Sequence, residues 1–180
     1  MKTRNQQKSF TLTEILIYIA VLSIITLTAS SFFLWISRSN VKARAMREVT
    51  TNGERVIQMI TAEIKEAENI YTPTSVFDFH PGQLSLEITK YLPEGETTSY
   101  LDFYLCGIDR TQLCFKKESQ DPIALTSERV EVNNLVFNQI ITSGAPSIQI
   151  NLKIDYKSPA NKPEYQASFD TISTVSLRSY

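Results

Sequence analysis

The fold of this chain is decided by a short stretch, Lys8-Ser9-Phe10-Thr11-Leu12-Thr13-Glu14, which leads directly into the apolar residues 15–22. Glu14 is therefore a carboxylate at the entrance of an apolar helix. At the centre of a bilayer such a charge costs about 2.5–3.5 kcal/mol, and it costs less near the headgroups. Two interpretations follow: Glu14 lies at headgroup level, as in an ordinary signal anchor, or it has a partner charge.

Residues 15–36 carry no formal charge, and these 22 residues are enough to cross a hydrocarbon core of about 30 Å as a helix. Hydroxyl side chains in this segment can bond back to the helix, and Phe32, Phe33 and Trp35 stand at its far end, as interfacial aromatics do. The apolar region of a secretory signal peptide has only about 7–15 residues, so we expect this segment to be retained. Basic residues flank both ends, so the charge count does not decide the orientation.

A second helical pattern follows at residues 38–70. Apolar side chains recur there at intervals of three and four residues, while most charged residues occupy the other faces. The stripe consists of Met46, Val49, Gly53, Val56, Ile60, Ile64 and Ala67. No proline precedes Pro73, so we expect one helix over residues 12–70, with Gly53 as its weakest point. The stripe can form a coiled-coil seam or pack on the following domain, and its length of only about three heptads favours packing.

After residue 73 the pattern changes from helical to β. Alternating apolar and polar residues predict strands that proline and glycine separate. The predicted strands cover residues 84–88, 100–106, 112–116, 130–137, 148–156 and 169–177, with Asn133-Asn134 as a bulge or short turn. A sheet needs a cover for its apolar face, and the amphipathic helix is available, so we predict an α+β fold with this helix packed on an antiparallel sheet domain. The predicted contacts join Val56, Ile60, Ile64 and Ala67 to Ile150, Leu152 and Ile154.

Residues 8–14 resemble the cleavage site of type IV prepilins and pseudopilins, in which Phe, Thr, Leu, any residue and Glu follow the scissile bond. The resemblance implies that a membrane-embedded prepilin peptidase cuts between Ser9 and Phe10 and methylates the new amine of Phe10. Ser9 stands where glycine is usual. The amine on Phe10 would lie one helical turn from Glu14, at about 5–6 Å between side chains. The carboxylate would then offset either that charge or the amine of an adjacent subunit.

The resemblance divides the chain into a leader at residues 1–9, a membrane and filament-core helix at 10–37, an amphipathic continuation at 38–70 and a β domain at 71–180. Three further segments, at residues 54–67, 123–137 and 175–178, are similar to the J-type minor pseudopilin of type II secretion and to W-type minor pilins. By this resemblance the chain is a structural subunit that crosses the bacterial inner membrane once, with its N-terminus in the cytoplasm. Its partners would be the peptidase, other minor and major subunits, the assembly platform and membrane lipid.

Cys106 and Cys114 flank a predicted hairpin turn at residues 107–111, at positions symmetric about Arg110. Directly opposed residues in a non-hydrogen-bonded pair approach to about 4.5 Å between Cα atoms, which is close to disulfide range. The pair can therefore form a disulfide outside the cytoplasm or remain two buried thiols.

Candidates for catalysis and metal binding are few. His80 is the one histidine and stands beside Pro81 in a predicted turn, and the five glycines are isolated, so neither a phosphate loop nor a dinucleotide motif can form. Four acids could approach one another to hold calcium, but without a defined ligand spacing they are better interpreted as a solvated rim. These acids are Asp102, Asp109, Glu118 and Asp121. We expect no enzyme activity, no metal and no cofactor.

The formal net charge is −1, and loss of the basic leader side chains would make it −4. This balance lacks the broad basic footprint of a nucleic-acid binder, and the basic cluster at residues 38–47 is interpreted as solvated or near phospholipid. Two other functions stay open: a minor pilin for DNA uptake or adhesion, and an unprocessed, signal-anchored extracytoplasmic protein. The first predicts salt-dependent DNA affinity, and the second predicts no shortening of the chain in cells.

Overall fold

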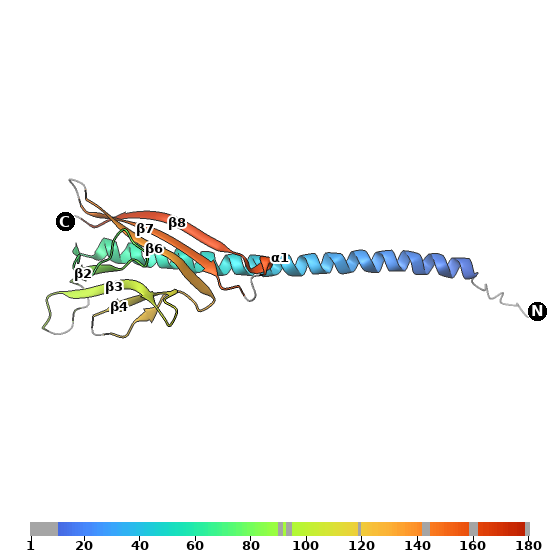
Figure 1. Ribbon diagram of the computed structural model, residues 1–180, viewed down its shortest axis with the longest axis horizontal. Helices are drawn as coiled ribbons and strands as arrows, with labels where there is room; N and C mark the ends of the chain where they lie inside the picture. The colour runs from blue at the N-terminus through green and yellow to red at the C-terminus, as the bar shows by residue number, and fades with distance from the viewer. Residues whose placement is uncertain are drawn as a thin grey trace, which may run out of the picture. The chain divides into compact units, whose positions relative to one another are not determined.

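The computed structural model describes residues 11–89, 92, 95–118, 120–141, 145–158 and 162–178. The chain divides into two compact units, Met1–Asn40 and Val41–Tyr180. Its described elements are a long helix followed by strands that all pair in antiparallel fashion (Figure 1). The predicted α+β class is confirmed.

Helix α1 (Leu12–Glu66) passes through Gly53 without interruption. It ends before the predicted limit at residue 70, so the predicted amphipathic helix over 38–70 was wrong at its C-terminal end. The reason is pairing with another strand: β1 (Asn69–Ile70) lies opposite Glu87 and Leu86. Main-chain hydrogen bonds to that neighbour replace the helical ones, which local sequence preference does not reveal.

The first sheet has five strands in the order β1-β2-β3-β4-β5. After β1, its strands are β2 (Leu84–Ile88), β3 (Ser99–Cys106), β4 (Gln112–Lys117) and β5 (Ile123–Ala124). The three longer strands follow the predicted ranges closely. The two-residue strands β1 and β5 were not predicted, because two residues are too few to show an alternation.

The second sheet has three strands in the order β6-β7-β8. These are β6 (Val130–Ile140), β7 (Ser147–Tyr156) and β8 (Ser168–Ser176), with a short 3-10 helix, η2 (Pro163–Tyr165), before β8. The register of β6 on β7 shifts between Val132 and Asn134, so the predicted bulge is confirmed. The alternation of residues predicted the strands but did not distinguish one sheet from two.

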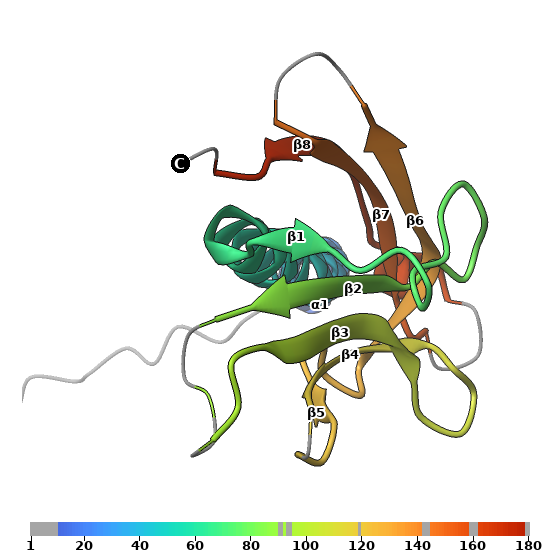
Figure 2. The same cartoon turned by 90° about the vertical axis from the view of Figure 1, so that its left-hand side faces the viewer.

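The second half of α1 lies in the angle between the two sheets, as the view along the helix shows (Figure 2). Its buried residues are Ala45, Val49, Asn52, Gly53, Val56, Ile60 and Ile64. Ile150, Leu152 and Ile154 of β7 are fully buried in the same hydrophobic cluster as the helix stripe, which agrees with the predicted packing of the helix on the sheet domain. Each fully buried aliphatic side chain contributes about 1.5–3 kcal/mol, which makes this contact a large part of the domain's stability.

Gly53 has a specific packing role in this core. A Cβ atom built on Gly53 would lie 2.2 Å from Cδ1 of Phe169 in β8, which is far inside van der Waals contact. The absence of a side chain therefore lets the Phe169 ring lie directly against the helix backbone. The helical cost of glycine, about 1 kcal/mol relative to alanine, is offset by this close contact.

Candidate assembly site at the start of helix α1

The described part of the motif begins at Thr11, since the predicted cleavage and methylation residues Ser9 and Phe10 lie outside the described residues. The main-chain N–H of Glu14 donates to Thr11, with its nitrogen 3.1 Å from the carbonyl oxygen and 3.4 Å from Oγ1. A threonine in this position satisfies one of the N–H groups that lack a partner at the start of a helix. The residues of the motif therefore also close the first turn of α1.

Glu14 is the acidic residue of this first turn and is half-buried, whereas residues 15–40 are all exposed. A carboxylate here stabilises the helix by about 0.3–1 kcal/mol, because it offsets the positive end of the helix dipole. Thr11 and Glu14 also form the Ser/Thr-x-x-Glu pattern of a capping box, which our sequence reasoning missed. That pattern was the available signal for the start of α1.

The apolar half of α1 has no cover within the described chain. Its large apolar side chains, from Leu12 at 78% to Ile36 at 38% exposure, are all exposed. A helix that is apolar on all sides needs a lipid or protein environment, and α1 is long and apolar enough to cross a membrane.

The hydroxyl groups of this half bond back to the helix, as predicted. Ser23 Oγ donates to the carbonyl of Ile19 at 2.7 Å, and Ser30 Oγ donates to that of Thr26 at 2.8 Å. Such bonds satisfy polar donors that would be costly to expose to hydrocarbon. The Ser and Thr residues are therefore compatible with an apolar environment.

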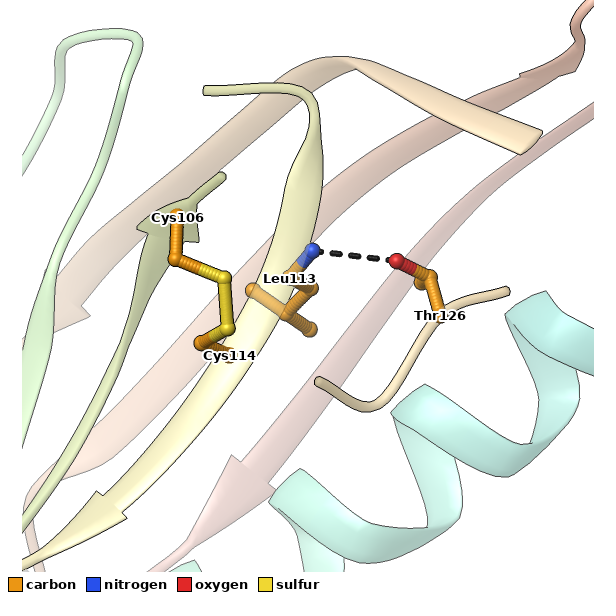
Figure 3. Close-up of a disulfide and its surroundings, with 4 residues drawn as sticks. All are labelled: Cys106, Leu113, Cys114 and Thr126. Atoms are coloured by element: carbon orange, nitrogen blue, oxygen red, sulfur yellow. Dashed lines mark hydrogen bonds between the residues drawn. A yellow bond between two sulfur atoms is a disulfide. The ribbon is translucent and has the colours of Figure 1, made fainter. Parts of the chain in front are cut away.

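A disulfide joins Cys106 in β3 to Cys114 in β4, with a Cα–Cα distance of 5.7 Å (Figure 3). The expected direct opposition of the two cysteines was wrong: Cys106 lies opposite Gln112, and Cys114 lies opposite Tyr104. The centre of the hairpin falls one residue before Arg110, so the bond joins diagonal neighbours on one face of the sheet. Turn geometry sets this register, and a count of residues cannot supply it.

Loop residues after β5 hold the hairpin from its other side. The main-chain N–H of Leu113 donates to Thr126 Oγ1 at 3.1 Å, as Figure 3 shows, and the N–H of Leu125 donates to the carbonyl of Leu113 at 2.8 Å. Thr126 is only 3% exposed. The hairpin that carries the disulfide is therefore held on one edge by β2 and on the other edge by Leu125 and Thr126.

Three of the other candidates for chemistry have structural partners. His80 Nδ1 accepts the main-chain N–H of Leu135 at 3.0 Å, which joins the loop before β2 to β6. Asp102 Oδ1 accepts the hydroxyl of Ser85 at 2.5 Å, and Glu118 Oε2 accepts the main-chain N–H of Tyr100 at 3.2 Å. Among the residues that the structure describes, no three His, Cys, Asp or Glu side chains gather as a metal site would require.

Tyr71 and Tyr100 pack together on the same sheet, with ring centroids 4.6 Å apart. Desolvation raises the pKa of the Tyr100 phenol, and the nearby Glu87 carboxylate adds to this effect. The phenol is therefore uncharged at neutral pH, so it supplies no ionised group for catalysis.

The comparisons with known proteins point to the N-terminal segment. A family model described as the prokaryotic N-terminal methylation motif matches residues 4–30, which include the bond between Ser9 and Phe10 and the carboxylate Glu14. No curated protein and no solved structure matches the chain. The motif supports a type IV pilin-like or pseudopilin protein, and the long N-terminal helix followed by an antiparallel β domain is consistent with the pilin fold.

This class of protein suggests a structural subunit rather than an enzyme. Its motif implies processing by a prepilin peptidase and assembly with other pilins. The apolar N-terminal helix together with the motif is consistent with a protein that crosses the inner membrane once.

Proposed function

We propose that this protein is a minor subunit of a type IV filament, either the pseudopilus of a type II secretion system or a type IV pilus. The observation that carries the proposal is a methylation motif at residues 4–30 that leads into a helix whose apolar side chains are exposed on every side. Polymerisation would cover these side chains, because the helices of neighbouring subunits can pack against one another. The similarity of residues 54–67, 123–137 and 175–178 to J-type and W-type subunits favours the minor class.

In this mechanism the peptidase hydrolyses the bond between Ser9 and Phe10 and releases residues 1–9. A methyl group is then transferred from a methyl donor to the new amine of Phe10. Residues 10–37 stay in the membrane until assembly, and the β domain faces the extracytoplasmic side. Glu14 then pairs with the amine of its own or an adjacent subunit in the apolar core of the filament. A charge pair in such surroundings is screened far less than one in water, so it can set the register of each incoming subunit.

The intact mass of the native protein tests the processing step. Cells with active peptidase should yield a chain that lacks residues 1–9 and carries one methyl group, and cells without the peptidase should yield the full chain. Ser9→Gly restores the usual residue before the bond and should be cut at least as fast as the natural chain. If the chain keeps Met1–Ser9 in cells with active peptidase and the protein still functions normally, it is an unprocessed anchor. That result would overturn the proposal.

The substitution Glu14→Gln tests the assembly step, because it removes the charge and keeps the shape. Incorporation into filaments should fall at least about tenfold, the equivalent of about 1.4 kcal/mol, while the β domain should unfold as in the natural chain. Glu54→Gln, at an exposed position in the second half of α1, is the matched control and should assemble normally. Equal incorporation of both variants would remove the proposed role of Glu14.

A further inference from the structure

Strand β8 has an open edge. It lies at one end of the three-stranded sheet and pairs with β7 on one side only, as Figure 2 shows. Just beyond one end of this pairing, the main-chain N–H of Tyr156 donates to the carbonyl of Ala167 at 2.9 Å. Beyond the other end, the N–H of Leu177 donates to the carbonyl of Pro146, also at 2.9 Å. The hydrogen bonds of an antiparallel pair alternate, so the odd-numbered residues of β8 face β7, and the even-numbered residues in 168–176 direct their N–H and C=O groups to the open edge.

The fold covers its other sheet edges but not this one. Within the described part of the chain, no hydrogen bond reaches the outward main-chain groups of β8. The other long edge strand, β6, is covered by the loop before β2: the N–H groups of Asp78 and Gly82 donate to the carbonyls of Phe137 and Leu135 at 2.9 and 2.8 Å. In the five-stranded sheet, the edge strands β1 and β5 have two residues each, and very short edge strands are a common protection against pairing with another chain. Among the described edge strands, β8 alone is both long and uncovered.

The sequence of β8 also lacks the residues that protect an edge. Natural edge strands carry lysine, proline or a bulge for this purpose. Ser168–Ser176 contains no lysine or proline, its pairing with β7 shows no register shift, and its one charged residue is Asp170. Ile172, at the centre of the strand, is 63% exposed. A long strand of hydroxyl and β-branched residues with a free edge is a template for a further strand.

A groove continues from the end of this edge. It has a volume of about 780 Å³ and lies between the last turns of α1 and residues 176–178. The helix contributes Gln58, Thr61, Ala62, Lys65 and Glu66 to its walls. Most of these residues are three or four apart, so they belong to one face of α1. Ser176 belongs to both the open edge and the groove, so a strand that follows the edge past Ser176 would contact this face of the helix.

We propose that the open edge of β8 binds an extended peptide segment of another protein, which adds to the sheet as a fourth, antiparallel strand. The chemistry of the edge selects this occupant. Pairs of N–H and C=O groups recur there at every second residue, about 6.8 Å apart, and another extended chain presents the matching acceptors and donors at that spacing. An antiparallel strand continues the pattern of this sheet and pairs slightly more stably than a parallel one.

The charges beside the edge indicate the composition of the segment. Lys65 and Arg178 outnumber Glu66 in the groove at the Ser176 end, whereas Asp170 lies near the opposite end of β8. An antiparallel segment with an acidic residue near its start and a basic residue near its end complements both ends. Between them, neutral β-branched residues match the centre of β8.

A second copy of this chain does not fit the edge in a membrane. Phe169 lies against Gly53, and Leu177 shares the groove with Ala62, so β8 runs along α1 in the same direction as the helix (Figure 1). An antiparallel pair of β8 strands would therefore turn the α1 helix of the second copy the other way. Two copies whose α1 helices enter the same membrane from the same side cannot form this pair. Only this exclusion uses the proposed function.

The test uses the full, isotope-labelled chain in detergent micelles, with main-chain hydrogen exchange followed by NMR. In the protein alone, the N–H groups of Asp170, Ile172 and Thr174 should exchange at least about tenfold faster than those of Thr171 and Ser173, which face β7. The probe is the synthetic peptide Ser-Glu-Thr-Val-Val-Ile-Lys-Thr-Ser, whose central valine would lie opposite Ile172. The peptide should slow exchange at the three outward N–H groups at least about tenfold and leave the two inward ones unchanged.

Two N-methylated peptides separate strand pairing from general adhesion. Methylation of the central valine removes the N–H that would bond to Ile172, and it should weaken binding at least about tenfold. Methylation of the valine before it changes an N–H that would point away from β8, so the affinity should stay within about threefold. Equal affinities of the two methylated peptides would show that the peptide does not add as a strand, and would overturn the proposal.

Matched variants of the protein test the same edge. Thr174→Pro removes an outward N–H and spares the hydrogen bonds to β7, so the peptide should bind at least about tenfold more weakly. Thr174→Ala keeps that N–H and should bind the peptide as the natural chain does. Ile172→Lys changes no main-chain group and adds a protecting lysine, so it should also weaken binding at least about fivefold. Denaturant unfolding checks that each variant is folded, and folded Thr174→Pro and Ile172→Lys chains that bind the peptide normally would overturn the proposal.

The remaining outcomes identify other occupants. If the outward N–H groups are protected without peptide at every protein concentration, the chain closes its own edge and the proposal is overturned. If their protection rises with protein concentration, a second copy is the occupant and the assignment to another protein is overturned. Failure of the peptide to protect these groups would overturn the edge as a binding site. None of these results concerns the loss of residues 1–9 or the role of Glu14, so the proposed function stands or falls separately.

Discussion

The two halves of helix α1 are both rich in apolar residues, but their surroundings differ. In the first half, residues 15–40 are exposed on every side. In the second half one stripe is buried in the angle between two sheets, and the charged residues face outward. Leu22 is 61% exposed, whereas Ile60 is fully buried. One continuous helix therefore lies in two kinds of surroundings: the apolar side chains of its first half are exposed, and the buried stripe of its second half is part of the domain core.

This difference predicts that equal substitutions will have unequal effects on the β domain. Changes in the buried stripe should lower the free energy of unfolding, and changes in the exposed half should not. All measurements below use the full chain in detergent micelles, with denaturant unfolding of the β domain as the readout.

Ile60→Asp should have the largest effect. It places an unpaired charge in the fully buried stripe, so the free energy of unfolding should fall by more than about 4 kcal/mol. Met59→Asp adds the same charge one residue earlier, at a side chain that is 37% exposed, and should cost less than about 1 kcal/mol. Equal losses of unfolding free energy for the two substitutions would mean that the stripe does not pack on the sheets.

Replacing both cysteines, Cys106→Ser with Cys114→Ser, should have the next largest effect. The bond closes a loop between residues eight apart, and loop entropy predicts a loss of about 2.5 kcal/mol. Reductant should lower the denaturant concentration at the unfolding midpoint of the natural chain to that of the variant. It should leave the midpoint of the variant unchanged. A natural chain that reductant does not affect would contradict the disulfide.

Gly53→Ala should lower the free energy of unfolding by about 1–3 kcal/mol, because the new Cβ displaces the Phe169 ring. In a chain that already carries Phe169→Ala, the same substitution should instead stabilise by up to about 1 kcal/mol, since alanine is the better helix former. The change of sign tests the contact directly. Stabilisation in both backgrounds would show that Phe169 does not lie against Gly53.

Leu22→Ala should have the smallest effect. The side chain lies in the exposed half, so the unfolding of the β domain should change by less than about 0.5 kcal/mol. A loss comparable to the 2–5 kcal/mol of a core Leu→Ala substitution would show that the first half also packs on the domain. Leu22 then could not be free for lipid or for a neighbouring subunit.

The sequence predicted what local patterns encode. A charge-free segment, an amphipathic stripe and regular alternation identified the two halves of α1 and the longer strands, because each pattern repeats over many residues. Residues 8–14 predicted the N-terminal methylation motif through fixed spacing. The cap at Thr11 was also encoded locally, in the pattern that links it to Glu14, although it was not recognised.

Other features depend on residues that are distant in the sequence. The end of α1 at Glu66 depends on pairing between β1 and β2, and the diagonal position of Cys114 depends on the hairpin register. A groove on the domain is lined by both Arg55 of α1 and Arg129 of the loop before β6. None of these partners is visible in a local window of sequence.

The amino-acid sequence by itself determined which segments are apolar, which residues alternate and where the motif lies, because these properties depend on neighbours along the chain. Only the tertiary structure decided that the strands form two sheets, that Gly53 receives the Phe169 ring and that four arginines share a groove. The physical reason is that burial and charge clustering depend on distance in space, and chain folding sets that distance.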